Sequence, residues 1–205
     1  WVEVAATVVL SLAVLVSAWS AYQAARWGGV QSANASQYAA HLIESSEVST
    51  LIETQLELDS QAMSTWLIMA AEDNAQGMRL VEERFGDTLR PAFDAWKGGS
   101  IDGGIPPGLP QDLPEYEAGF EELLEVQAFH FGNATDATEM AAEANRTSDS
   151  FVLITVVMAS VMFFAGIGAK LRGRTTRINM LVIAGLLCIG AIAAILSLPH
   201  QPVDF

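Results

Sequence analysis

Three histidines, two of them close to glutamates, are the residues of this sequence best suited to metal chemistry. The neighbours are as follows: His41 precedes Glu44 and Glu47, and His130 follows Glu122 and Glu125. Di-iron bundles use Glu-x-x-His on facing helices, whereas Gln127 stands three residues before His130 and the first pair has the reverse order, His-x-x-Glu. No ligand set is complete, and His200 lies in a Pro-bounded tail without a partner. The pattern therefore favours ordinary side chains on helix surfaces, and we expect neither a metal nor a cofactor.

Paired glutamates form a second set of candidates. Three pairs have i, i+4 spacing: Glu53 and Glu57, Glu121 and Glu125, and Glu139 and Glu143. This spacing puts two carboxylates on one helix face, where like charges mildly destabilise the helix. Such pairs could attract cations to a negative vestibule or bind a divalent cation weakly. Calcium sites need a shaped loop that supplies many oxygens, and no such loop pattern occurs, so a solvated acidic face is the favoured interpretation.

Hydroxyl side chains within apolar segments are the candidates for ion conduction. Thr7 and Ser11 stand one helical turn apart in the first apolar segment, and several copies of them could line a pore. The alternative is helix packing through hydroxyls and small residues such as Ala165 and Ala169, which we favour. No ionisable residue lies in the middle of an apolar segment, which argues against proton-coupled transport and voltage sensing.

An aromatic helix is the candidate for a protein-binding surface. Phe85, Phe93 and Trp96 lie in a segment whose apolar residues recur at helical spacing. The sequence has no P-loop, Gly-x-Ser-x-Gly, His-Glu-x-x-His or dinucleotide motif. The single cysteine, Cys188, stands within an apolar run, where a thiol is buried and inert. We therefore expect a protein that is not an enzyme and that binds another envelope protein through its aromatic helix.

Composition and charge divide the chain into two kinds of segment. Its 205 residues are 51% hydrophobic, yet the net charge is −14, and mean hydropathy is +0.32. A soluble chain with that charge would be poorer in apolar residues, so the two properties must belong to different segments. Ten basic residues against 24 acidic ones argue against nucleic acid as a partner. A membrane protein with an acidic exposed part remains.

Three uncharged apolar segments are long enough to cross a bilayer, which takes about 20 residues of helix. They cover residues 4–25, 151–169 and 178–198, and each should be helical because the bilayer offers the backbone no water. The alternative for the first is a cleaved signal peptide. Its length, and the interfacial girdle of Trp19, Tyr22 and Trp27 around its end, favour a retained helix. Because the sequence opens on Trp1 and not on Met, we expect further residues upstream.

The distribution of charge predicts the orientation. Four basic residues crowd the short link between the second and third segments: Lys170, Arg172, Arg174 and Arg177. Short basic loops stay in the cytoplasm, so the N-terminus should be cytoplasmic and residues 28–150 extracytoplasmic, in an inner (plasma) membrane. Residues 28–150 hold 22 acidic and five basic residues, a net charge of −17.

These arguments define the expected domains. The segments in order are a first span with its girdle (1–27), the acidic outer domain (28–150), a second span (151–170), a basic cytoplasmic loop (171–177), a third span (178–198) and an outer tail (199–205). In the outer domain we expect the first span to continue through Gly28-Gly29, where it could bend, as a long helix over residues 30–76. A second helix, kinked or restarted at Pro91, leads to a loop over residues 98–114, which hold five Gly and four Pro. A last helix from Glu115 runs into the second span.

Several motifs of the sequence resemble a family of uncharacterised bacterial membrane proteins. The resemblance rests on these residues: Trp19-Ser20, Tyr22-Gln23, Arg26-Trp27, Gly29 and Gln31 at the end of the first span; Arg84-Phe85, Arg90 to Trp96 and Pro114 to Tyr116 in the outer region; and Phe163 to Gly166 with Lys170-Leu171 at the second span. It implies a three-span protein with an outer helical domain. It implies no activity.

Two functional hypotheses follow. The first is an all-α, homo-oligomeric membrane scaffold or accessory protein that binds a partner through its acidic outer domain. Self-association is expected because the outer helix carries a narrow stripe of small apolar residues, which buries little area in a lone stalk. The alternative is a homo-oligomeric cation channel with an acidic outer vestibule and a pore lined by the first span.

Overall fold

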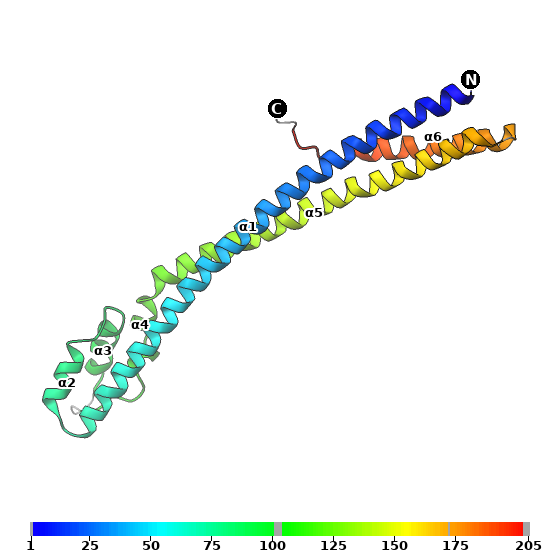
Figure 1. Ribbon diagram of the computed structural model, residues 1–205. Coiled ribbons are helices and arrows are strands. Elements are labelled where there is room, and N and C mark those ends of the chain that lie inside the picture. Colours follow the sequence, from blue (N-terminus) through cyan, green and yellow to red (C-terminus); the bar gives the residue numbers. More distant parts are fainter. Residues whose placement is uncertain (1, 101–103, 172, 203–205) are drawn as a thin grey trace. The chain divides into compact units, whose positions relative to one another are not determined.

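The computed structural model describes residues 2–100, 104–171 and 173–202, and every regular element among them is helical (Figure 1). The elements in chain order are α1 (Val2–Ala71), α2 (Ala75–Glu82), α3 (Leu89–Gly98), a 3₁₀ turn η1 (Pro110–Asp112), α4 (Pro114–Ala118), α5 (Glu121–Lys170) and α6 (Arg174–Ser197). The predicted all-α class is confirmed, and α1, α5 and α6 are long and apolar enough to cross a membrane. Four of the predicted segments include residues that lie outside the described ones. They are the first span, the loop 98–114, the link 171–177 and the tail 199–205.

The chain divides into two compact units. Unit 1 comprises residues 1–37 and 136–205, and unit 2 comprises residues 38–135. Helices α1 and α5 contribute to both units. The helix α1 continues through Gly28 and Gly29 without interruption.

In unit 1, parts of α1, α5 and α6 pack around a shared core of apolar side chains (Figure 1). Ala13 of α1, Ala165 of α5 and Ala184 of α6 are fully buried, and such small residues let helix backbones approach closely. Helix α6 begins four residues before the predicted third span. Arg174 and Arg177 therefore belong to its first turn and not to a loop.

Polar contacts join α1 to α6 and to the chain that follows α6. Gln23, fully buried, donates from Nε2 to the Gln201 carbonyl (3.1 Å) and accepts from the Gln201 amide at Oε1 (3.0 Å). Trp27 Nε1 donates to the Pro199 carbonyl at 3.1 Å. The polar and aromatic residues at the end of the first apolar segment therefore hold the chain that leaves α6. At the other end, the Arg177 guanidinium lies 3.4 Å from the Glu3 carboxylate.

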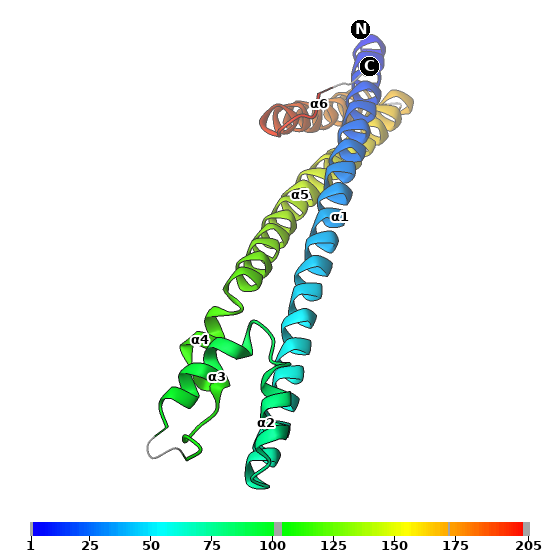
Figure 2. The ribbon, with the colours of Figure 1, turned by 90° about the vertical axis from the view of Figure 1, so that its left-hand side faces the viewer.

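In unit 2, α1 and α5 run side by side, and α2, α3 and α4 lie beside them (Figure 2). The helix α1 ends where Asp73 takes a left-handed conformation (φ 52°), which Asp tolerates better than most residues. The Asn74 side chain then caps α2 by accepting from the Gly77 amide at 2.8 Å. The sequence predicted a helix kinked or restarted at Pro91, and two helices form, the second beginning at Leu89. Pro91 falls in the first turn of α3, where its missing N–H breaks no helical hydrogen bond.

Candidate functional site

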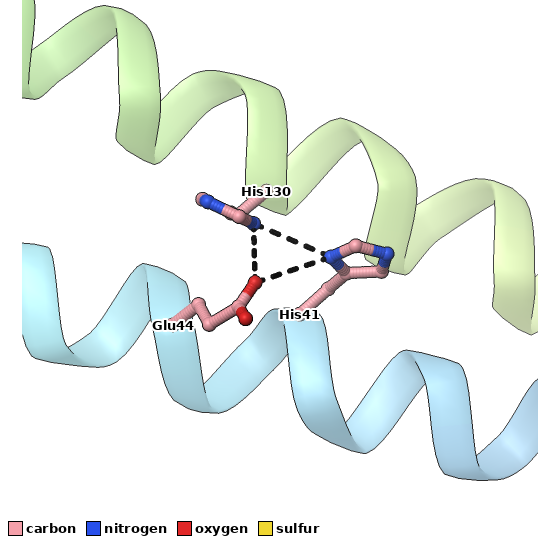
Figure 3. A group of neighbouring side chains, drawn as sticks. All are labelled: His41, Glu44 and His130. Carbon is pink, nitrogen blue, oxygen red and sulfur yellow. Dashed lines mark hydrogen bonds and ion pairs between the residues drawn. The ribbon is translucent and has the colours of Figure 1, made fainter.

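Three potential metal ligands from two helices of unit 2 converge on one point (Figure 3). His41 and Glu44 stand one turn apart on α1, and His130 faces them from α5. The His130 Nδ1 lies 2.7 Å from Glu44 Oε2, and the His41 Nδ1 lies 3.5 Å from the same oxygen. The two Nδ1 atoms are 3.3 Å apart, whereas the other nitrogen of each ring points away from the group (Figure 3). This set, His41, Glu44 and His130, is called the His–Glu triad below.

The sequence interpretation placed these histidines on helix surfaces and found no complete ligand set, and the expectation of no metal stays a prediction. That interpretation compared each histidine with glutamates near in sequence, whereas His130 approaches His41 from 89 residues away. Gln127, whose identity argued against a Glu-x-x-His motif, instead donates to Ser49 Oγ on α1 at 2.5 Å. The available signal was a His-x-x-Glu pair on one long helix and a lone histidine on another. Only the register of α1 against α5 brings them together.

A buried polar pair joins α1 to α4. Asp59 is 3% exposed and Tyr116 is 3% exposed. The Tyr116 hydroxyl donates to Asp59 Oδ2 at 3.0 Å, and Gln55 Nε2 donates to Asp59 Oδ1 at 2.9 Å. Burial raises the pKa of the Asp59 carboxyl, and the two hydrogen bonds oppose that shift. Burial and the hydrogen bond to Asp59 likewise raise the pKa of the Tyr116 phenol.

An open apolar groove lies beside this pair. Its volume is about 480 Å³. It is lined by residues of α1, of the stretch from η1 to α4 and of the start of α5, which are Ile52, Leu56, Gln111, Asp112, Leu113, Pro114, Tyr116, Glu117, Phe120 and Leu124. A second surface depression shares Pro114, Glu117 and Leu124 with it and adds Glu121 and Glu125. The two form one surface, the acidic groove, whose lining combines apolar side chains with the carboxylates of Asp112, Glu117, Glu121 and Glu125.

The predicted cation-attracting glutamates do not gather at one place. Glu121 and Glu125 belong to the lining of the acidic groove. Glu53 and Glu57 are exposed on α1 in unit 2, and Glu139 and Glu143 are exposed on α5 in unit 1. Their attraction of cations stays a prediction.

The three aromatic residues assigned to a partner surface are buried in the core of unit 2. Phe85, Phe93 and Trp96 are 8%, 1% and 5% exposed. Phe93 packs edge-to-face against Phe85 (4.8 Å between ring centres) and against Trp66 of α1 (5.2 Å). Their burial removes the reason for assigning them to a contact with another protein. The helical spacing identified an apolar face correctly, but Trp66 and Met63 of the same chain cover it.

A charged group closes the edge of this aromatic core. Glu82 Oε1 accepts from Trp66 Nε1 at 2.8 Å and from Lys97 Nζ at 2.7 Å. Burial by itself raises the pKa of the Glu82 carboxyl, but the hydrogen bonds from Lys97 and Trp66 and the nearby positive charges outweigh it, so that pKa lies below its usual value.

The hydroxyls predicted to line a pore are exposed at the surface of unit 1. Thr7 Oγ1 donates to the Glu3 carbonyl at 2.9 Å, and Ser11 is exposed on the same helix. Exposure within one chain suits a pore and a lipid-facing surface equally. The cation channel therefore stays a prediction.

Comparison with protein-family models, with characterised proteins and with solved structures finds no match to this chain. The resemblance of its motifs to an uncharacterised family stays a prediction as well. The functional argument rests on the geometry of the two units.

Proposed function

We propose that this chain is a non-enzymatic, membrane-anchored adaptor whose unit 2 binds a basic segment of a partner protein outside the inner membrane. The observation that carries the proposal is the acidic groove, which combines apolar side chains with carboxylates in a unit of strongly negative charge. The proposal has four parts: how the chain is anchored, which side unit 2 occupies, what the groove binds, and whether the chain self-associates.

The apolar surface of unit 1 supports membrane anchoring. Leu15 of α1, Leu153 of α5 and Leu186 of α6 are each about two-thirds exposed, at 67%, 64% and 66%. In water such a surface would favour aggregation, whereas in a bilayer it contacts lipid. Three helices of this unit have the length and hydropathy for spanning.

Charge at the ends of unit 1 supports the orientation. Arg177, at the start of α6, pairs with Glu3, at the start of α1, and Lys170 ends α5 nearby in sequence. The basic end is expected in the cytoplasm. The ends of α1 and α5 that belong to unit 2 then emerge on the opposite side, which makes unit 2 extracytoplasmic.

The partner is proposed from charge complementarity and from the shape of the groove. Unit 2 contains 18 acidic and four basic residues. Leu56 and Leu124, which are 40% and 41% exposed, offer apolar contacts. Asp112 and Glu117 add carboxylates to the lining of the groove. An amphipathic helix with one apolar and one cationic face would fit such a surface, because its apolar anchors fill the groove and its charges face the carboxylates.

Binding of designed helical peptides to the full chain in nanodiscs tests this proposal. A labelled peptide with leucines on one face and lysines on the other should bind, and versions with glutamate for lysine or serine for leucine should not. Leu56→Ser should weaken binding roughly 10- to 150-fold, because burying a leucine contributes about 1.5–3 kcal/mol. Leu42→Ser is the matched control, since Leu42 is 41% exposed on the same helix but outside the groove. Equal binding of the acidic peptide, or equal loss in both variants, would refute the proposed groove.

Self-association is a separate part of the proposal. Ile43, Leu51 and Leu58 are 60%, 59% and 54% exposed along α1, at spacings of eight and seven residues that place them near one face of a helix. A second copy could cover this face as in a helical bundle. Native mass spectrometry of the detergent-extracted chain should show more than one copy, and Leu51→Ser should shift it toward monomer. A monomeric wild type would contradict self-association and leave the groove proposal untouched.

A further inference from the structure

We propose that the His–Glu triad binds a first-row divalent transition-metal ion, with Zn²⁺ as the ion that fits best, and that this ion links α1 to α5 within unit 2. This site does not depend on the acidic groove or on its partner. It is built from the three residues whose ligand atoms converge in Figure 3.

The separation of the three ligand atoms matches a metal site. Zinc binds imidazole nitrogen and carboxylate oxygen at about 2.0–2.2 Å in a tetrahedral arrangement, so two ligand atoms on one ion lie roughly 3.3–3.5 Å apart. The distance between the two Nδ1 atoms is 3.3 Å. The distance from His41 Nδ1 to Glu44 Oε2 is 3.5 Å. Only the edge between His130 and Glu44, now a 2.7 Å contact, has to lengthen, by roughly 0.6–0.8 Å.

The electrostatics of the triad favour a cation between its members. With both Nδ1 atoms unprotonated, two lone pairs and one carboxylate oxygen face the same point, and a positive ion satisfies all three. Without an ion, a proton on His130 Nδ1 would let that nitrogen donate to Glu44 Oε2 across the 2.7 Å contact, and a metal ion would replace this proton on binding. The other nitrogen of each ring, Nε2, points away from the group (Figure 3). Nδ1 is therefore the ligand atom of each histidine.

The ligand types select the class of metal. Imidazole suits zinc, copper, iron and nickel, whereas calcium and magnesium prefer full oxygen coordination. Two histidines and one glutamate are a known ligand set for zinc with water in the fourth position. The side chains of His41, Glu44 and His130 are 31%, 51% and 20% exposed, so water and ions can reach the site. The single cysteine, Cys188, is buried in the core of unit 1 and does not compete.

An ion bound by the triad would connect α1 to α5, because the two helices supply its ligands. His41 and Glu44 belong to α1, and His130 belongs to α5, with the whole of α2, α3 and α4 between them in sequence. A metal shared by the two helices therefore links the two ends of unit 2. Amide hydrogen exchange around all three residues should slow when zinc is bound, because local opening of either helix would break a metal bond.

Zinc binding to the full chain in nanodiscs, purified with a tag that contains no histidine, tests the site. The wild type is expected to bind one zinc ion per chain by calorimetry and by elemental analysis after dialysis, and excess Mg²⁺ or Ca²⁺ should not displace it. His41→Ala and His130→Ala should each weaken zinc affinity by at least the roughly 10- to 100-fold that loss of an outer-shell partner brings. Glu44→Gln should weaken it as well.

Two matched variants serve as controls. Glu47→Gln removes a carboxylate from the next turn of α1, and His200→Ala removes the remaining histidine of the chain; both should bind zinc as the wild type does. Absence of zinc binding by the wild type would overturn the proposal, as would unchanged binding by His41→Ala and His130→Ala.

Nuclear magnetic resonance of the histidine rings keeps the test independent of variants that fail to fold. The chain has three histidines, so one set of ring signals is expected from each of three rings. Zinc should shift those of His41 and His130 and leave that of His200 in place. A shift of His200 alone, or equal shifts of all three, would show non-specific binding and contradict the site.

Discussion

Replacing Tyr116 by Phe tests the buried pair that joins α1 to α4. The substitution removes one hydrogen-bond donor and keeps the ring, which packs edge-to-face on Phe120 at 5.3 Å. Asp59, 3% exposed, then keeps only Gln55 among the donors that reach it. We expect unit 2 to lose stability because a buried charged group has lost a partner.

The expected loss follows from the kind of bond. A hydrogen bond to a charged group contributes about 1.5–3 kcal/mol, which corresponds to a roughly 10- to 150-fold change in the unfolding equilibrium. Urea unfolding followed by tryptophan fluorescence measures it, since Trp66 and Trp96 report on the core of unit 2. Tyr38→Phe is the matched control; Tyr38 is 39% exposed on α1, and its loss should change stability by less than about 0.5 kcal/mol.

The pH dependence of the Tyr116→Phe effect gives a sharper test. The pKa of Asp59 is raised in the folded protein, so the folded state binds that proton more tightly than the unfolded state does. The charged carboxylate therefore lowers stability above its folded pKa, and this penalty fades as the pH falls from there toward the ordinary value of 3.8. Tyr116→Phe removes a bond that lowers this pKa, so its destabilisation should shrink on acidification. A loss below about 0.5 kcal/mol at neutral pH, or one that is equal at every pH, would refute the reasoning.

Three further predictions concern other parts of the chain. A Cβ at Gly119 would lie 2.8 Å from the Thr88 methyl and 3.2 Å from backbone atoms, so Gly119→Ala should destabilise unit 2 by about 1–3 kcal/mol. Gly132 has open space around it, so Gly132→Ala should stabilise unit 2 by about 0.5–1 kcal/mol. The midpoints of urea unfolding of the two variants measure both effects. Gln23→Leu should speed amide exchange in the residues after α6, measured by mass spectrometry, and unchanged exchange would contradict their attachment. Because the pKa of Glu82 is lowered in the folded protein, its carboxylate stabilises the fold above pH 4.5, and this stability is lost as the pH falls through the folded pKa. Lys97→Met should reduce stability at neutral pH by about 1 kcal/mol or less. The variant should also lose less stability on acidification than the wild type.

The sequence predicted the helices better than it predicted which helices pack against one another. The three long apolar helices follow from uninterrupted runs of residues that favour helix, and the second span was expected to end at Lys170, where α5 ends. A break near Pro91 was expected, either as a kink or as the start of a new helix, and the structure shows the second, because α3 begins at Leu89. Such local signals depend only on neighbours in sequence.

The candidate sites depend on register between distant helices, which the sequence does not encode in any short pattern. The spacing of Phe85, Phe93 and Trp96 showed an apolar face but not that Trp66 would cover it. Likewise, nothing near His130 in the sequence shows that His41 and Glu44 face it from α1. The acidic groove was missed for the same reason, since α1, α4 and α5 each contribute to its walls.

The central claim, that unit 2 stands outside the membrane while the basic end of unit 1 faces the cytoplasm, is tested most directly by thiol labelling. Cys188→Ala removes the one native cysteine. In that background, Glu57→Cys in unit 2 and Thr175→Cys at the start of α6 each place a single thiol at an exposed position. A membrane-impermeant maleimide added to intact cells should label the Glu57→Cys chain, and it should label the Thr175→Cys chain only after the membrane is permeabilised. Labelling of Thr175→Cys in intact cells, with Glu57→Cys protected, would contradict the account.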